Sequence, residues 1–173
     1  MKDFIYNQKK IPKKQWRYGF RSRAATGCGW IATYNALRVM DYPASPEKII
    51  RYYQRQLPLI NGNFGTFLLS PVLFFKMSGF RVNVVFRKKK FDDVARQSDA
   101  CILFYYWRKK FKMGSHFVTV HHQDGRFVGY NTFSNSTTPD NYGSSLETFV
   151  KRQKYFGAVL SGIKDKNQDG DKT

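Results

Sequence analysis

The stretch GCGWIATYNALRVM, residues 27–40, decides how this chain folds. Apolar side chains occupy nearly every side of a 3.6-residue period along it, which is typical of a helix buried in the centre of a domain. Thr26 or Gly27 can cap the first turn, so we expect the helix to begin near Cys28 and to end near Met40. The start of this central helix therefore carries one of the two cysteines of the chain.

The first half of the chain is otherwise an irregular arm and two more helices. Residues 1–23 are basic and aperiodic, which indicates an irregular arm. The stretches 45–57 and 70–79 both begin with Ser-Pro, a pair that suits the N-cap and the first helical position. The first of these helices has a predicted buried stripe of Ile49, Ile50, Tyr53 and Leu57, and the second is expected to end at Gly79.

After Gly79 the apolar pattern changes to a period of two, which is typical of β-strands. Strands are expected over 80–86, 100–107, 116–122, 126–133 and 155–163, with turns at 112–115 and 123–125. Short helices are expected over 91–97 and 144–153, the second with Ser144 and Glu147 at capping-box spacing. An N-terminal helical half and a C-terminal, mostly antiparallel sheet define an α+β fold. We expect one domain over residues 1–163 and a flexible polar tail over 164–173.

The formal net charge is +18, and seven basic residues lie within positions 9–23. Such a charge attracts acidic peptides, polyanions or an acidic membrane face, or it is a solvated surface with no partner. No dedicated nucleic-acid motif and no metal-ligand spacing accompany it, so no metal is expected. No apolar stretch is long enough to span a bilayer and no leader is visible, so a cytoplasmic protein is expected unless a leader was removed.

Cys28 lies between two glycines at the predicted start of the central helix. Backbone N–H groups and the helix dipole favour an anion there, which lowers the pKa of a thiol and makes it a nucleophile. Gly27 and Gly29 leave room for a substrate backbone to approach closely. The alternatives are an inert core thiol, as expected for Cys101, a disulfide between the two cysteines, or a metal ligand.

A thiolate nucleophile needs a base, and the base needs a group that orients it. His116 opens the predicted strand 116–122, and Asn131 lies in the strand that follows. Folding at 123–125 brings the two strands side by side, so the Asn131 side chain can accept the second ring N–H of His116. Asn135 is the fallback for this orienting role. The alternatives are that His116 is a structural histidine and that Asn131 is a turn residue.

The motifs GCGWIATYNAL and SHFVTVHHQDGRFVGYNTF, in this order, resemble the papain-like cysteine peptidases, and the bacterial C39-like peptidases in particular. The resemblance extends over about residues 15–133. It implies the papain-like fold, hydrolysis of a peptide or amide bond through an acyl-thioester, and no cofactor. It also implies that Cys28 is the nucleophile, His116 the base and acid, and Asn131 the orienter.

The oxyanion-hole Gln of that family is missing from its usual position in this sequence. Papain-like enzymes usually have an oxyanion-hole Gln a short distance before the Cys, and this chain has Ser22 in that region. The nearest upstream Gln is Gln15, which is our candidate for the role. Asn7 and Gln8 are more remote candidates.

The function expected from the sequence is therefore that of a cysteine peptidase or amidase acting on a peptide or protein. The basic residues before Cys28 are expected to favour acidic substrates and to favour the thiolate. Two alternatives stay open. The same fold can transfer an acyl group to an amine, and a catalytically weak relative can be a basic binding protein for polyanions.

Overall fold

The structure is a computed structural model, and it describes residues 3–12, 15–16, 27–55, 66–109, 112–153 and 155–166. Helices come first along the chain and strands follow. The helical first half holds η1 (Gln8–Lys10), α1 (Cys28–Val39), α2 (Pro46–Arg55) and α3 (Ser70–Met77). The second half holds β1 (Arg81–Val85), η2 (Lys88–Lys90), α4 (Phe91–Arg96), β2 (Ala100–Lys109), β3 (Lys112–Gln123), β4 (Arg126–Tyr130), β5 (Asp140–Gly143), α5 (Leu146–Arg152) and β6 (Gly157–Lys164).

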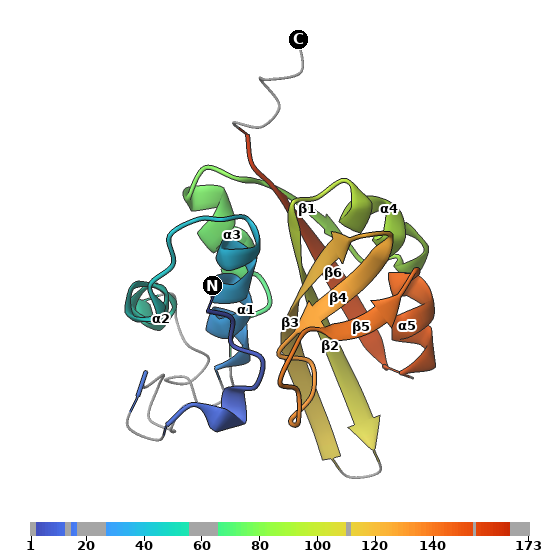
Figure 1. The fold of residues 1–173 in the computed structure, drawn as a ribbon, viewed down its shortest axis with the longest axis horizontal. Helices are drawn as coiled ribbons and strands as arrows, with labels where there is room; N and C mark the ends of the chain where they lie inside the picture. The colour runs from blue at the N-terminus through green and yellow to red at the C-terminus, as the bar shows by residue number, and fades with distance from the viewer. Residues whose placement is uncertain are drawn as a thin grey trace.

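The described strands form one sheet in the order β1-β6-β2-β3-β4-β5, and every neighbouring pair is antiparallel. The arrangement confirms the predicted α+β fold (Figure 1). In the pairing of β2 with β3, Tyr105 lies opposite His116. The pairing of β4 with β3 begins only at Thr119, so the earlier part of β3 has no β4 neighbour along that edge.

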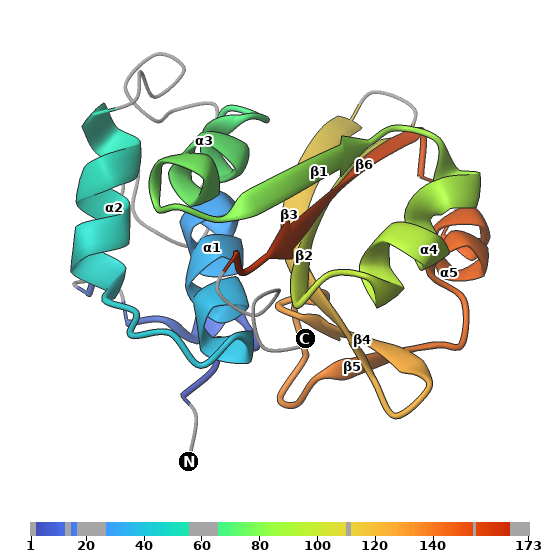
Figure 2. The same cartoon turned by 90° about the horizontal axis from the view of Figure 1, so that it is seen from above.

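Helices cover both faces of this sheet (Figure 2). On one face, α1, α2 and α3 share a core with Ala100 and Ile102 of β2. On the other face, α4 and α5 share a second core with Cys101 and Leu103 of the same strand. Side chains of a strand alternate between its two faces, so the unbroken apolar run of β2 supplies both cores.

The central helix α1 is buried along most of its length, and the side chains of Thr33 and Asn35 have partners within the chain. The hydroxyl groups of Thr33 and Tyr53 lie 2.5 Å apart. The Asn35 side chain accepts the N–H of Ile5 and donates to the Ile5 carbonyl, both at 2.9 Å. This pair of hydrogen bonds satisfies a buried amide and fastens the N-terminal segment to α1.

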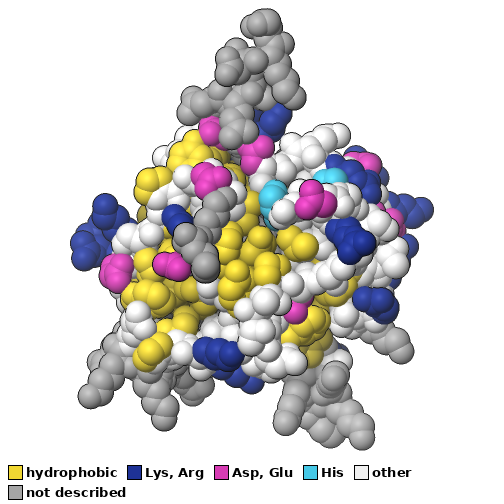
Figure 3. Space-filling model, in the orientation of Figure 1, with side chains coloured by type: hydrophobic (Ala, Val, Ile, Leu, Met, Phe, Trp, Pro, Cys, Tyr) yellow, Lys and Arg dark blue, Asp and Glu magenta, His cyan; other side chains and the backbone are white. Residues whose placement is uncertain are grey.

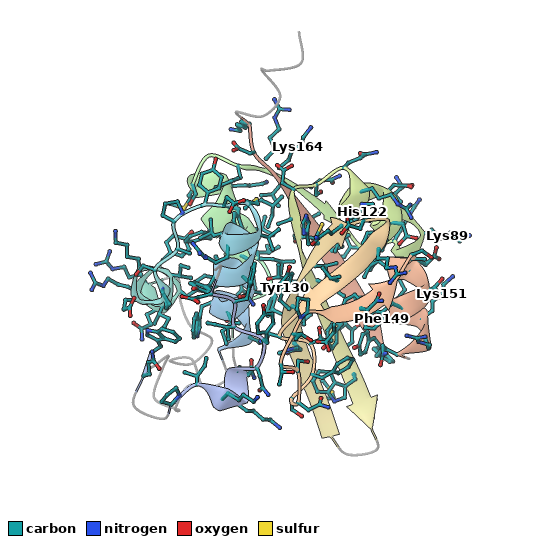
Figure 4. The ribbon with its side chains drawn as sticks, viewed as in Figure 1. Lys89, His122, Tyr130, Phe149, Lys151 and Lys164 are labelled. Atoms are coloured by element: carbon teal, nitrogen blue, oxygen red, sulfur yellow. The ribbon has the colours of Figure 1, made fainter. Side chains whose placement is uncertain are left out.

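The N-terminal segment, residues 3–12, bridges the helical half and the sheet. On the sheet side it contacts Tyr130 at the end of β4, whose ring centroid lies 4.6 Å from that of Phe4 and 6.2 Å from that of Tyr6. Tyr130 lies where the two halves meet (Figure 4). Hydrophobic side chains gather across the middle of this face of the molecule (Figure 3). The segment therefore ties together the two halves between which the predicted site lies.

Two local predictions are wrong by a few residues. The predicted turn at 112–115 belongs to β3, where Met113 pairs with Arg108 of β2. The N-cap of α5 is Ser145, whose hydroxyl accepts the N–H of Thr148 at 3.1 Å, so the predicted capping box at Ser144 is displaced by one residue.

The predicted tail also begins too early. β6 continues through Lys164, and Asp165 is buried, with its N–H donating to a carboxylate oxygen of Asp99 at 2.7 Å and its own carboxylate accepting the hydroxyl of Tyr42. The predicted positions of Thr26 and Leu57 and the rest of the tail, 167–173, lie outside the described residues. Among the described helices, none has the length and apolarity needed to cross a membrane.

Candidate active site

Cys28 lies in the first turn of α1, where this helix meets β3. The side chain is 7% exposed. The backbone N–H groups of Phe117, Gly29 and Cys28 itself lie near the sulfur and favour its charged form. Phe117 lies in the part of β3 that has no pairing with β4. The thiol therefore lies beside a stretch of β3 that is unpaired along one edge.

Burial raises the pKa of the Cys28 thiol, because a thiolate is poorly solvated inside the protein. The three N–H groups oppose this shift but are outweighed by it. The expectation that the helix terminus would lower the pKa is therefore wrong in its net direction, since desolvation exceeds the effect of the helix terminus. Cys28 rests as a thiol and needs a base in order to act as a nucleophile.

His116 precedes Phe117 on β3, and its ring is oriented by the backbone of Asn131. The Nε2 atom lies 2.6 Å from the Asn131 carbonyl oxygen. A carbonyl oxygen can only accept a hydrogen bond, so Nε2 carries the proton and Nδ1 of the neutral ring carries the lone pair. Burial lowers the pKa of His116, and the bond to the carbonyl opposes the shift. The ring is therefore held neutral, with Nδ1 as its proton acceptor.

Asn131 contacts His116 through its backbone and Gln8 through its side chain. It follows β4 with a φ of +63°, in the left-handed region that Asn adopts more readily than most residues. Its Oδ1 accepts the Gln8 N–H at 2.9 Å, and its Nδ2 donates to Gln8 Oε1 at 3.3 Å. The predicted bond from the His116 ring to the Asn131 side chain is not made, and the predicted strand ends at Tyr130. The fallback residue, Asn135, is exposed.

Tyr105 lies beside His116, opposite it in the pairing of β2 with β3. Its ring packs edge-on against that of His116, with 5.8 Å between ring centroids. Burial is the main cause of the raised pKa of Tyr105, and the negative charge of neighbouring tyrosines and of Cys28 adds to it. The Tyr105 ring thus packs against His116, and His116 itself precedes Phe117, whose backbone N–H lies near the Cys28 sulfur.

A cavity of about 330 Å³ opens beside His116. Gln8 lines this cavity, together with the residues around it in the N-terminal segment and those that follow Asn131. Gln15 is exposed, its N–H bonds the Pro12 carbonyl at 3.0 Å, and it does not line the cavity. The contact between Gln8 and Asn131 spans 123 residues, so only the tertiary structure could favour Gln8 over Gln15.

Gly29 does not leave the room for a substrate backbone that the sequence had predicted. A Cβ atom at Gly29 would lie 2.3 Å from Oγ1 and 2.5 Å from Cβ of Thr66, which are impossible contacts. The space over Gly29 is therefore filled by Thr66 of the chain itself, not left open for a substrate. Gly27 is the N-cap residue of α1, and it makes no side-chain capping bond.

Other predicted features fall partly within the described structure. Cys101 is 1% exposed, and burial raises its pKa to about 12, as expected of a core thiol. Of the basic residues at 9–23, the structure describes Lys9 and Lys10, and Lys9 lines the cavity beside His116. The others, Lys13, Lys14, Arg17, Arg21 and Arg23, lie outside the described residues. Within those residues, no group of three His, Cys, Asp or Glu side chains could hold a metal ion.

The arrangement of this sheet and its central helix is similar to the papain-like fold of known peptidase domains. The peptidase domain of Streptococcus ComA, a bifunctional ABC transporter involved in quorum sensing, matches 80% of this chain and 91% of that domain, with a TM-score of 0.50 and 17% sequence identity. The Pseudomonas avirulence protein AvrPphB matches 79% of this chain and 89% of its own, with a TM-score of 0.42 and 12% identity. No family model and no curated protein sequence matches the chain.

Proposed function

We propose that this protein is a cysteine peptidase or amidase in which Cys28 is the nucleophile and His116 the general base and acid. The observation that carries the proposal is the 2.6 Å contact between His116 Nε2 and the Asn131 carbonyl oxygen. It assigns the ring proton to Nε2 and leaves Nδ1 as the acceptor, on the residue before Phe117, whose backbone N–H lies near the Cys28 sulfur. A similar fold in a peptidase domain agrees with the proposal.

Acylation begins with the thiol and the neutral imidazole. His116 Nδ1 takes the thiol proton while the Cys28 sulfur attacks the carbonyl carbon of the substrate, giving a tetrahedral oxyanion and an imidazolium. The Cys28 N–H, which belongs to the first turn of α1 and has no partner within the helix, is a suitable donor to that oxyanion. The carbon–nitrogen bond then breaks, the imidazolium protonates the leaving amine, and an acyl-thioester is left on Cys28.

Deacylation repeats these steps with water. His116 takes a proton from a water molecule while the water oxygen attacks the thioester carbonyl carbon. The carbon–sulfur bond then breaks, and the imidazolium returns the proton to the sulfur. The products are a carboxylic acid and the free Cys28 thiol. An amine in place of water gives acyl transfer through the same intermediate, so the acceptor decides between a hydrolase and an acyltransferase.

Asn131 and Gln8 act as positioning residues in this scheme. The left-handed backbone of Asn131 directs its carbonyl to His116, and the two bonds to Gln8 hold that backbone in place.

The neutral state favoured for both Cys28 and His116 determines when the proton moves. Proton transfer within the pair must accompany attack, because the protein does not stabilise a thiolate beforehand.

A mixture of peptides from a digested proteome tests the proposal without a known substrate. New peptide termini, read by mass spectrometry, should appear with the unmodified protein and with Cys101→Ala, and should be absent with Cys28→Ala and His116→Gln. The same digestion with an added amine separates hydrolysis from acyl transfer. New termini that survive in Cys28→Ala would rule out the proposed nucleophile.

A further inference from the structure

A second cavity, of about 580 Å³, continues from the cavity beside His116. The two cavities share the lining residues Tyr105, Trp107 and Phe133, and the second reaches Arg108 on β2 and Arg152 at the end of α5. We call the combined space the basic groove. Each cavity has the size of an ordinary ligand site, about 300 to 1,000 Å³.

The wall of the basic groove is aromatic and well supported. The rings of Tyr105 and Tyr155 stack with 3.9 Å between centroids and 12° between planes. The Trp107 indole lies against Gly114 of β3, where a Cβ atom would come within 2.3 Å of the indole ring. Rings that are held in this way offer a flat, rigid surface to an apolar or aromatic side chain, at little cost in conformational entropy.

The charge of the basic groove is positive and uncompensated. Lys9 lines one end, and the exposed side chains of Arg108 and Arg152 line the other. No acidic side chain lines the groove among the described residues, and neither arginine has an acidic partner there. A guanidinium presents two parallel N–H donors to a carboxylate, so this end is suited to an acidic side chain.

We propose that the basic groove binds a peptide segment in which an acidic residue adjoins an aromatic or apolar one. This inference rests on the proposed function, because it makes the groove the recognition site of the peptidase. The aromatic wall takes the apolar side chain, and Arg108 and Arg152 take the carboxylate. Recognition of acid is thereby assigned to the end of β2 and the end of α5.

Fluorescence polarisation with labelled peptides tests the proposal on full-length Cys28→Ala protein, which cannot turn the probes over. The probes are Gly-Gly-Phe-Glu-Glu-Gly and the same peptide with Gln or Lys in place of both Glu residues. The Glu probe should bind most tightly. Arg108→Gln and Arg152→Gln should each weaken its binding by about twofold to fivefold, which is the contribution of an exposed ion pair. Higher ionic strength should reduce the preference for Glu.

Arg51→Gln is the matched control, because it removes the same charge from α2, on the opposite side of the molecule from α5 (Figure 1). It should leave the affinity for the Glu probe unchanged, whereas Arg152→Glu should shift the preference toward the Lys probe. Equal binding of the Glu and Gln probes, no saturable binding, or equal weakening by Arg51→Gln would overturn the proposal. None of these results depends on cleavage, so they are distinguishable from failure of the proposed function.

Discussion

Replacement of Asn131 by glycine separates the backbone of this residue from its side chain. Glycine adopts the φ of +63° without strain and keeps the carbonyl that accepts from His116 Nε2. It removes both hydrogen bonds to Gln8, at 2.9 and 3.3 Å. Each such bond contributes about 0.5 to 1.5 kcal/mol net, so Asn131→Gly should lower the free energy of unfolding by about 1 to 3 kcal/mol.

Asn131→Ala should cost more than Asn131→Gly. It loses the same two bonds and also forces a Cβ-bearing residue without a compensating side chain into the left-handed region, at about 1 to 2 kcal/mol. Gln8→Ala, which keeps the backbone N–H that donates to Asn131, should cost least of the three. Denaturant unfolding measures this order, with Asn131→Ala lowest in stability.

The rate at which iodoacetamide alkylates Cys28 near pH 7 tests the same variants for function. If the carbonyl orients His116, Asn131→Gly should slow alkylation by less than about threefold, whereas loss of the base in His116→Gln should slow it at least about tenfold. Buried Cys101 in the same sample serves as the internal reference. An Asn131→Gly protein that is folded and as slow as His116→Gln would refute the backbone account and favour a side-chain orienter.

Three further predictions follow from the buried contacts. Gly29→Ala should destabilise the protein by about 1 to 3 kcal/mol, because the new Cβ overlaps Thr66, and Thr66→Gly in the same chain should restore part of the loss in a double-mutant unfolding cycle. The unfolded chain takes up a proton at His116 below about pH 6.5, whereas burial lowers the pKa of His116 in the folded chain. The free energy of unfolding should therefore fall as the pH is lowered from about 7 to 5, and it should fall less in His116→Gln. The denaturant midpoint measures both. Burial raises the pKa of Cys101 to about 12, so this thiol should resist alkylation near pH 7 until the protein is unfolded in denaturant.

The elements with strong apolar patterns could be predicted from the sequence alone. The all-round apolar stretch after Gly27 gave a helix that ends one residue from its predicted limit, and the apolar run at 100–107 is the core of β2. The Ser-Pro pair at 70 lies at the start of α3, although Leu69 and not Ser70 is the N-cap. Local chemistry was sufficient in these places because the pattern itself reflects burial. The sequence also indicated that His116 and Asn131 lie close together, and they do, although through the carbonyl of Asn131.

The features that were missed depend on distant parts of the chain. No sequence pattern reports that the carbonyl of Asn131, and not its side chain, meets His116, since that follows from one positive φ. The contact of Gln8 with Asn131 depends on the bridging path of the N-terminal segment. The sequence indicates a helix terminus at Cys28, which lowers the pKa of the thiol. It does not report how deeply the thiol is buried, and burial raises the pKa by more than the backbone N–H groups lower it.

The central claim, that Cys28 is a nucleophile activated by His116, is tested most directly by the alkylation rate of Cys28 as a function of pH. The rate is measured with iodoacetamide by peptide mass spectrometry, in the unmodified protein, in His116→Gln and in the denaturant-unfolded chain. The account predicts that near pH 7 Cys28 of the folded protein reacts at least about tenfold faster than Cys28 of folded His116→Gln, because His116 takes the thiol proton during attack, and that the two proteins react equally once they are unfolded. A folded Cys28 that reacts equally fast without His116 would contradict it.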